Sequence, residues 1–388
     1  MTWSGPTDRF RRSGVAKSSA RSNRQASAKP QPELRRFVVL FEPETACRDR
    51  LTACGMSAEA AAEVAFYLAQ ANDFAAMIGS IAAAFAATGV EALAPPLDQR
   101  ERWLPLLTGP ERHATLVWCL TDGFAYYRGS FVASVAALLD VAQFGSPPEA
   151  QHLCQDKFRS LALARALGVR TPATVLVQDG EPLSPVDVLP EGTPLFVKPA
   201  TLGGKIGIED DSLAPDLPRA LELTRRIHAR YRDRALIQSY VPGRDVRVSF
   251  MDLERPEAPL GVYAVSTGAA RGFPTLADSR RITQLRGAGP TLALQDLRDD
   301  PALPTSVAAI EEAARRIARV VPLRDYFSLD FRLDEAGVPW FLELEVCPAV
   351  TIYDFLTYLH DAHGTDLPGA LAVAAPLAFA RRKAAGFG

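Results

Sequence analysis

The chain has 388 residues, 48% of them hydrophobic, and its 43 basic and 45 acidic residues give a formal net charge of −2. This length can bury a large core and predicts two or three domains. The near-neutral charge argues against nucleic acid and anionic membranes as partners, and no apolar stretch reaches the roughly 18 residues needed to cross a bilayer. The five cysteines are scattered and lack metal-ligand spacing. We therefore expect a soluble protein of a reducing compartment, the cytoplasm.

Residues 1–35 are rich in Ser, Arg, Lys and Pro and poor in acidic residues. This composition predicts a disordered basic extension. Organelle transit peptides share the same character, so the sequence leaves two interpretations open, a targeting segment or a plain solvated extension. The second needs no further assumption.

Strands and helices alternate after this extension. The apolar run FVVLF after Arg36 predicts a buried strand, a polar loop follows, and helical periodicity extends over 57–88. A second strand at 114–120 precedes a helix at 134–142. This alternation predicts a doubly wound parallel sheet, and the turn-forming segment GSPPEA suggests that the first domain spans 36–146.

The next segment predicts one amphipathic helix from about His152 to Gly168, with Lys157 near its start. Apolar strands follow at TVLVQ, LFVKP and ALIQS, and a helix is expected from Leu217 to Tyr231. We place a second domain boundary near residue 238, which gives a central domain at 147–238 and a C-terminal domain at 239–388.

The segment from Tyr326 to Val346 reads as a hairpin, two alternating runs around the turn Asp334 to Gly337. Pairing Leu333 with Val338 places one apolar set on a common face. Its expected members are Phe327, Leu329, Phe331, Leu333, Trp340, Leu342, Leu344 and Val346. The opposite face would then carry Ser328, Asp330, Arg332, Phe341, Glu343 and Glu345.

Three carboxylates on one face repel one another by several kcal/mol, so the cluster needs a cation or full hydration. Carboxylate oxygens suit Mg²⁺ or Mn²⁺, which also bridge nucleotide phosphates. The alternation alone equally fits an amphipathic hairpin with a solvated acidic face.

Three further segments occur with this hairpin in a specific order and spacing. They are QDKF at 155–158, FVKPATLGGKIG at 196–207 and ALIQSYVPGRDVRV at 235–248, and the hairpin itself contributes SLDFRL and FLELEVCPAVT. On these segments, the chain from about Leu120 to His360 resembles the D-alanine-D-alanine ligases of the ATP-grasp superfamily. The resemblance implies an ATP-grasp fold of α/β and α+β domains, in which an N-terminal doubly wound parallel-sheet domain precedes two subdomains that clamp ATP.

The resemblance also implies an activity: ATP phosphorylates a carboxylate, and an amine attacks the acyl phosphate to form an amide. It places Lys157 and Lys198 on the nucleotide phosphates, and it makes Asp330, Glu343 and Glu345 the metal ligands. The phosphate loop would include Gly203, Gly204 and Gly207. Gln238, Ser239 and Val241 would line the adenine, and Asp245 would accept hydrogen bonds from the ribose hydroxyls. Taken singly, each lysine also fits a solvated surface position, and the loop also fits a simple glycine turn between strands.

Several positions depart from the family pattern. Glu345 stands where the family has Asn, Gly204 and Lys205 replace a paired serine, and Ser328 replaces an arginine that steadies the tetrahedral intermediate. Asp354 replaces a serine that receives the acceptor carboxylate. Because an aspartate would repel that carboxylate, we expect an acceptor other than D-alanine, with Asp354 meeting an ammonium, a hydroxyl or water.

Positive charge at the acyl phosphate would then come from Lys205, or from Arg280 and Arg281. The alternatives are a helix N-terminal role for Asp354 and a solvated loop for the arginine pair. Glu42, after the first strand, is a candidate for binding a substrate amine, because ligands gather at the carboxyl ends of parallel strands. Glu44 is a second candidate there, and either glutamate also fits a plain loop position.

The predicted function is thus an ATP- and magnesium-dependent ligase (Mn²⁺ being the other candidate metal) that joins a small carboxylate to an amine in specialised-metabolite or amino-acid-conjugate biosynthesis. A true D-alanine-D-alanine ligase with a remodelled site and a degenerate ATP-binding interaction module are the alternatives. The resemblance also suggests a homodimer.

Overall fold

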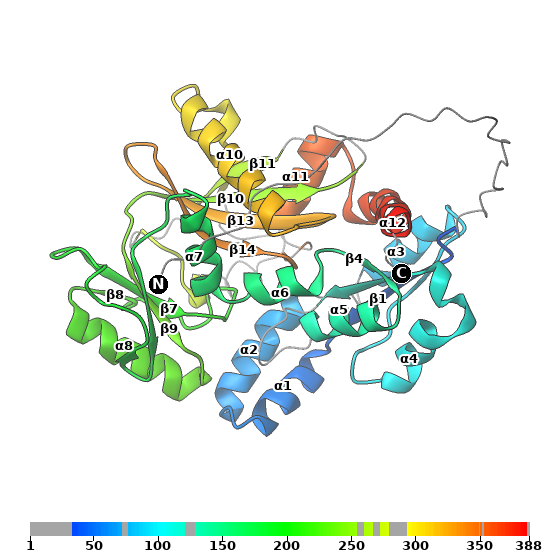
Figure 1. Cartoon of the computed structure of the whole chain (residues 1–388), viewed down its shortest axis with the longest axis horizontal. Helices are drawn as coiled ribbons and strands as arrows, with labels where there is room; N and C mark the ends of the chain where they lie inside the picture. Colours follow the sequence, from blue (N-terminus) through cyan, green and yellow to red (C-terminus); the bar gives the residue numbers. More distant parts are fainter. Residues whose placement is uncertain are drawn as a thin grey trace, which may run out of the picture. The chain divides into compact units, whose positions relative to one another are not determined.

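Three β-sheets organise the part of the chain that the computed structural model describes (Figure 1). The described residues are 33–71, 77–120, 129–253, 260–266, 272–278, 293–348, 350 and 353–385. Residues 33–388 form one compact unit. Residues 1–32, with most of the predicted basic extension, lie outside the described residues.

The first sheet is parallel and has the strand order β2-β1-β3-β4, which confirms the prediction for this region. Its strands are β1 (Arg36–Phe41), β2 (Glu91–Leu93), β3 (Thr115–Leu120) and β4 (Ala142–Phe144). β3 is buried along its whole length, as expected of a parallel strand covered on both faces.

The helices of this region correct three expectations. The supposed polar loop after β1 contains a helix, and the periodic stretch at 57–88 forms two helices. The helix expected at 134–142 begins earlier and ends at Leu138, before strand β4. The helices are α1 (Glu44–Ala53), α2 (Ala58–Ala71), α3 (Ile78–Ala86), α4 (Arg100–Thr108) and α5 (Gly129–Leu138), with a 3₁₀ turn η1 (Pro110–Ala114).

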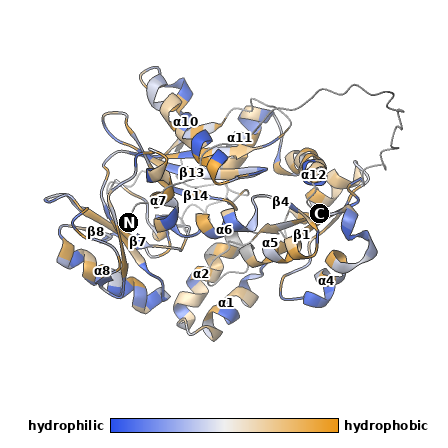
Figure 2. Cartoon of the chain, in the orientation of Figure 1, coloured by the Kyte–Doolittle hydropathy of each residue, from blue (hydrophilic) through white to orange (hydrophobic). Residues whose placement is uncertain are grey.

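The second sheet is antiparallel, with the order β6-β5-β9-β7-β8. Its strands are β5 (Thr174–Gln178), β6 (Glu181–Pro182), β7 (Leu195–Pro199), β8 (Leu213–Ala214) and β9 (Ala235–Ser239). Helix α8 (Leu217–Tyr231) has the predicted bounds. Hydrophilic and hydrophobic residues are interleaved along it (Figure 2), and its buried side packs on the sheet.

The helix expected from His152 to Gly168 is in fact two helices, α6 (Pro148–Cys154) and α7 (Lys157–Ala166). The break has a local cause, because Asp156 leaves the helical conformation and caps α7 by accepting from the Arg159 N–H. Lys157 thereby becomes the first residue of α7.

The third sheet is antiparallel, with the order β12-β11-β10-β13-β14. Its strands are β10 (Arg244–Met251), β11 (Gly261–Ser266), β12 (Ala293–Asp296), β13 (Tyr326–Leu333) and β14 (Pro339–Glu345). The accompanying helices are η2 (Leu297–Asp299), α10 (Pro304–Val320), α11 (Tyr353–His363) and α12 (Leu367–Ala384).

The predicted hairpin exists as β13 and β14, but its register differs from the prediction. Leu333 pairs with Pro339 instead of Val338, and the register shifts again between Asp330 and Phe331. Leu342 is therefore an extra residue in β14, a β-bulge. Between the bulge and the turn, the residues of β14 therefore face the sides opposite to those predicted. Phe341 pairs with Phe331 in the core, and Leu342 is not part of the core.

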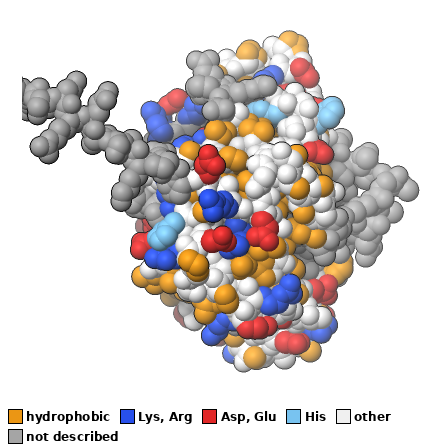
Figure 3. Space-filling model, turned by 90° about the vertical axis from the view of Figure 1, so that its right-hand side faces the viewer, with side chains coloured by type: hydrophobic (Ala, Val, Ile, Leu, Met, Phe, Trp, Pro, Cys, Tyr) orange, Lys and Arg blue, Asp and Glu red, His pale blue; other side chains and the backbone are white. Residues whose placement is uncertain are grey.

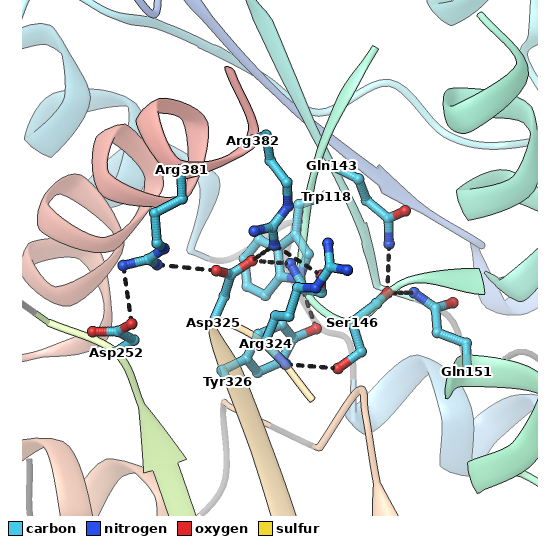
Figure 4. Close-up of polar contacts among 11 residues, drawn as sticks. Trp118, Gln143, Ser146, Gln151, Asp252, Arg324, Asp325, Tyr326, Arg381 and Arg382 are labelled. Atoms are coloured by element: carbon cyan, nitrogen blue, oxygen red, sulfur yellow. Dashed lines mark hydrogen bonds and ion pairs between the residues drawn. The ribbon is translucent and has the colours of Figure 1, made fainter. Parts of the chain in front are cut away.

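Segments far apart in the sequence share cores. Residues of the parallel sheet pack with α11 and α12, and residues of α1 and α2 pack with the second sheet. A buried polar cluster also joins distant segments (Figure 4). In it, Asp325 accepts from Arg381, Arg382 and the Gly145 N–H. The predicted domain boundaries, the first of which falls beside Gly145, stay a prediction.

None of the described helices is long and apolar enough to cross a membrane. On the face drawn in Figure 3, basic and acidic side chains lie beside one another among hydrophobic ones.

Candidate functional site

A pocket lies between the second and third sheets. One wall comes from β7, β9 and the loop 201–208, and the other comes from β10, β13 and β14. Predicted site residues lining it are Lys157, Lys198, Gly203, Gly204, Lys205, Gln238, Ser239, Val241, Asp245, Asp330 and Glu343. The fold thus brings together most of the residues that the sequence suggested.

The three predicted metal ligands lie together at this pocket. Asp330 on β13 pairs directly with Glu343 on β14, and Glu345 follows two residues later. Each of the three carboxylates offers an oxygen within 4.8 Å of the others. Three hard oxygen donors at this spacing beside a lysine-lined pocket fit Mg²⁺ or Mn²⁺ bound to a nucleotide.

Two buried lysines control the charge of this cluster. Lys157 Nζ lies 2.9 Å from Glu343 Oε2 and donates to the Leu202 carbonyl at 2.8 Å. Burial by itself would raise the pKa of Glu343, but Lys157 and Lys198 outweigh it and lower that pKa to about 2. Glu343 is therefore a carboxylate at any physiological pH.

The two lysines are shifted in opposite directions. Burial disfavours the charged form of both. For Lys157 the neighbouring Glu343 outweighs burial and raises the pKa, whereas for Lys198 burial dominates and the pKa is lowered. The positive charge of Lys198 is thus balanced less well by nearby carboxylates than that of Lys157. A bound phosphate would supply the missing negative charge.

Three residues of the loop after β7 adopt left-handed backbone conformations. Gly204, Lys205 and Gly207 all have φ between 64° and 72°. A Cβ at Gly207 would approach Pro199 Cγ to 2.7 Å, so the loop needs glycine there. Lys205 carries a side chain in the same region, which costs about 1–2 kcal/mol, and such strain is concentrated at functional sites.

The far end of the pocket is aromatic and was not predicted. Phe196, Tyr240 and Phe273 form a cluster in which the Phe196 and Phe273 rings lie 5.0 Å apart, edge to face. The side chain of Gln238 is buried and donates to Thr174 Oγ1 at 2.9 Å. An apolar wall beside strand backbone suits a flat heteroaromatic ring.

Two arginines on the same sheet were also missed. Arg332 is buried and donates to Asp245 at 2.8 Å, and Arg247 binds Asp330 and Glu345. Alternation around buried Val246 and Val248 would have placed Arg247 on the face of Asp245. The sequence could not show that β10 pairs with β13.

The remaining predicted site residues do not line the pocket or lie partly or wholly outside the described residues. Glu42 follows β1, and Arg50 binds both of its carboxylate oxygens. Asp354 is the second residue of α11, which matches the alternative helix N-terminal position, and its side chain lies outside the described residues. Arg280 and Arg281 also lie outside them.

Comparison with known proteins identifies the class. No protein-family model matches the sequence. A D-alanine-D-alanine ligase of Synechococcus sp. (strain JA-3-3Ab) is 28% identical over 266 residues, 65% of this chain and 73% of that protein. The structure of a Bacillus anthracis D-alanine-D-alanine ligase complexed with ATP has a TM-score of 0.62 at 16% identity, over 90% of this chain and 99% of that one.

A D-Ala:D-Ser ligase from Enterococcus faecalis is similar in structure, with a TM-score of 0.58 at 14% identity, over 89% of this chain and all of that one. These likenesses and the three-sheet architecture confirm the predicted fold, which is the ATP-grasp fold. In sequence and in structure the chain is similar to D-alanine-D-alanine ligases.

Proposed function

We propose that the protein is an ATP-dependent ligase that joins a carboxylate to an amine through an acyl phosphate, with an acceptor other than D-alanine. The observation that carries the ligase assignment is the convergence of Asp330, Glu343 and Glu345 beside the two buried lysines Lys157 and Lys198. This combination of fixed negative and positive charge is what a metal-bound triphosphate requires.

Each part of the pocket has a task in this proposal. The aromatic cluster and β9 hold the base, Asp245 meets the ribose, and the loop 201–208 covers the phosphates together with Lys157 and Lys198. The carboxylates would hold Mg²⁺, which neutralises charge on the transferred phosphoryl group. A substrate carboxylate oxygen attacks the γ-phosphorus and ADP leaves, then an amine attacks the acyl carbon and phosphate and a proton leave.

The acceptor assignment rests on position 354. An aspartate in the first turn of α11 would repel a carboxylate that approaches it, so a free amino-acid carboxylate is a poor partner. Lys205, which lines the pocket, remains our candidate for positive charge at the acyl phosphate, and the assignments of Arg280, Arg281 and Glu42 stay predictions. The reducing compartment, the cytoplasm, stays a prediction. The homodimer is also still a prediction.

The relatives favour a second candidate, D-alanine-D-alanine ligation, because the curated proteins that match at 28% and 27% identity bear that name. The experiment that separates the two measures ADP and phosphate release by the purified protein with Mg-ATP against a panel of amino acids and small carboxylates. We expect turnover with an amine other than D-alanine. Robust turnover with D-alanine alone would overturn our acceptor, and tight ATP binding without turnover would favour an interaction module.

The metal assignment has its own test. We expect Glu343→Gln to lower ligase turnover at least a hundredfold, because the residue both contacts Lys157 and belongs to the carboxylate cluster. The matched control is Glu335→Gln in the exposed turn of the same hairpin, which should leave turnover unchanged. Unchanged turnover in Glu343→Gln would show that the metal site lies elsewhere.

A further inference from the structure

Arg247 lies in the middle of the carboxylate cluster. It pairs with Asp330 across β10 and β13, and its side chain is about one-fifth exposed. Its Nε lies 2.7 Å and its Nη2 3.1 Å from the two oxygens of Asp330, and its Nη1 lies 2.9 Å from Glu345 Oε2. One guanidinium therefore joins two of the three expected metal ligands.

The third carboxylate has a different partner. Glu343 is bound by Lys157, so the cluster divides into a lysine-bound acid and two arginine-bound acids. Ser328 reinforces the second group, because its hydroxyl donates at 3.0 Å to the same Glu345 oxygen that Arg247 contacts. Both oxygens of Asp330 already have a guanidinium partner, so a cation that binds Asp330 does so beside a fixed positive charge.

We propose that Arg247 sets the affinity of this cluster for its divalent cation by cancelling the negative charge of Glu345. Arg247 is a positioning residue: it holds Asp330 and Glu345 at their spacing and makes the three acids act electrostatically as two. This inference rests on the proposed function, because it takes the cluster to be the metal site of the ligase.

The proposal predicts opposite effects of two substitutions. Arg247→Met removes a positive charge a few ångströms from the cation, so Mn²⁺ should bind about tenfold more tightly or better. Glu345→Gln keeps the shape but removes one negative charge from the cluster while Arg247 stays bound to Asp330, so Mn²⁺ should bind about tenfold more weakly or worse. The double variant should return to near the original affinity, and Arg247→Lys, which keeps the charge, should stay close to it.

The measurement is free Mn²⁺ by electron paramagnetic resonance, titrated into the full chain without nucleotide. Arg244→Met is the matched control, since Arg244 lies on the same strand outside the pocket, close to half exposed, and loses the same charge. Its Mn²⁺ affinity should not change. Circular dichroism melting of each variant shows that the fold is retained.

If Arg247 only held the carboxylates in place, its loss in Arg247→Met would weaken Mn²⁺ binding instead of strengthening it. If Arg247→Met binds Mn²⁺ no better or more weakly than the original protein, the proposal is overturned, while the proposed function stands. If the original protein binds no Mn²⁺, both the inference and the metal assignment of the proposed function are overturned.

Discussion

At the scale of single residues, Arg332 shows how one buried charge can organise a binding site. Its guanidinium donates to Asp245, to the Val241 carbonyl at 3.1 Å and to the Gly272 carbonyl at 3.0 Å. It also lies 5.5 Å from the centre of the Tyr240 ring. A buried arginine with this many acceptors holds two separate segments, 241–245 and Gly272, together at the pocket.

We therefore expect Arg332→Met to weaken ATP binding at least tenfold, because Val241, Asp245 and the residues after Gly272 lose their common donor. It should also lower the free energy of unfolding by about 2 kcal/mol, since the partly exposed Asp245 carboxylate and two carbonyls lose a partner. Calorimetric titration with ATP and urea unfolding measure the two effects. The Arg244→Met variant is again the control, and equal ATP affinities in both variants would contradict this role.

Residue identities explain which sites were predictable. The carboxylates were placed on one face correctly because the predicted and observed registers differ by an even number of residues at Asp330 and Glu343. Arg247 and Arg332 were missed because their roles depend on which strands pair, and pairing partners distant in sequence leave no local pattern. For Arg280, Arg281 and Asp354, the side-chain positions lie outside the described residues.

At the scale of elements, strong periodicity predicted the interior of helices and strands better than their breaks. Helix α8 was correct at both ends, since Asp216 caps it and Arg232 ends it in a left-handed conformation. The periodic stretch across α6 and α7 was read as one helix, because the capping role of Asp156 competes with a continuous apolar pattern. The bulge at Leu342 was missed for a similar reason, since nothing in an alternating sequence marks the extra residue.

The bulge leads to a paired stability prediction. Phe341 is fully buried against Phe331, so Phe341→Ala should lower the free energy of unfolding by about 3–5 kcal/mol. Leu342 lines the pocket, so Leu342→Ala should cost only about 1 kcal/mol and instead weaken ATP binding. Urea unfolding of both variants measures the two losses of unfolding free energy. Equal losses would mean that both side chains lie in the core.

At the scale of the whole molecule, the strand that carries the predicted metal ligand Asp330 is tied to the C-terminal helix and to the end of the parallel sheet. Asp325 immediately precedes β13 and is 1% exposed. It lies 2.5 Å from Arg382 of α12, and accepts from Gly145 beside the parallel sheet at 2.7 Å (Figure 4). Arg381 extends the network to Asp252 at 2.9 Å. The C-terminal helix therefore helps to position the strand that carries Asp330.

We expect Asp325→Asn to lower the free energy of unfolding by about 3–5 kcal/mol, because it leaves the Arg382 guanidinium buried without a negative partner. Asparagine tolerates the left-handed backbone of this residue, whose φ is 62°, so the change isolates the charge. Asp211→Asn, which breaks a more exposed set of ion pairs, is the control and should cost less than about 1 kcal/mol. A similar loss in both variants would argue against a special role for the buried cluster.

The extra residue in β14 has one more consequence. In a regular strand only every second side chain faces a given pocket, but the bulge lets the neighbours Leu342 and Glu343 both face it. Leu342 is part of the apolar wall, and Glu343 is a predicted metal ligand. Without Leu342, the pairs Phe331 with Phe341 and Asp330 with Glu343 would follow each other in an unbroken ladder. Deleting Leu342 would therefore remove one apolar side chain from the pocket and leave the alternation of both faces of the strand intact.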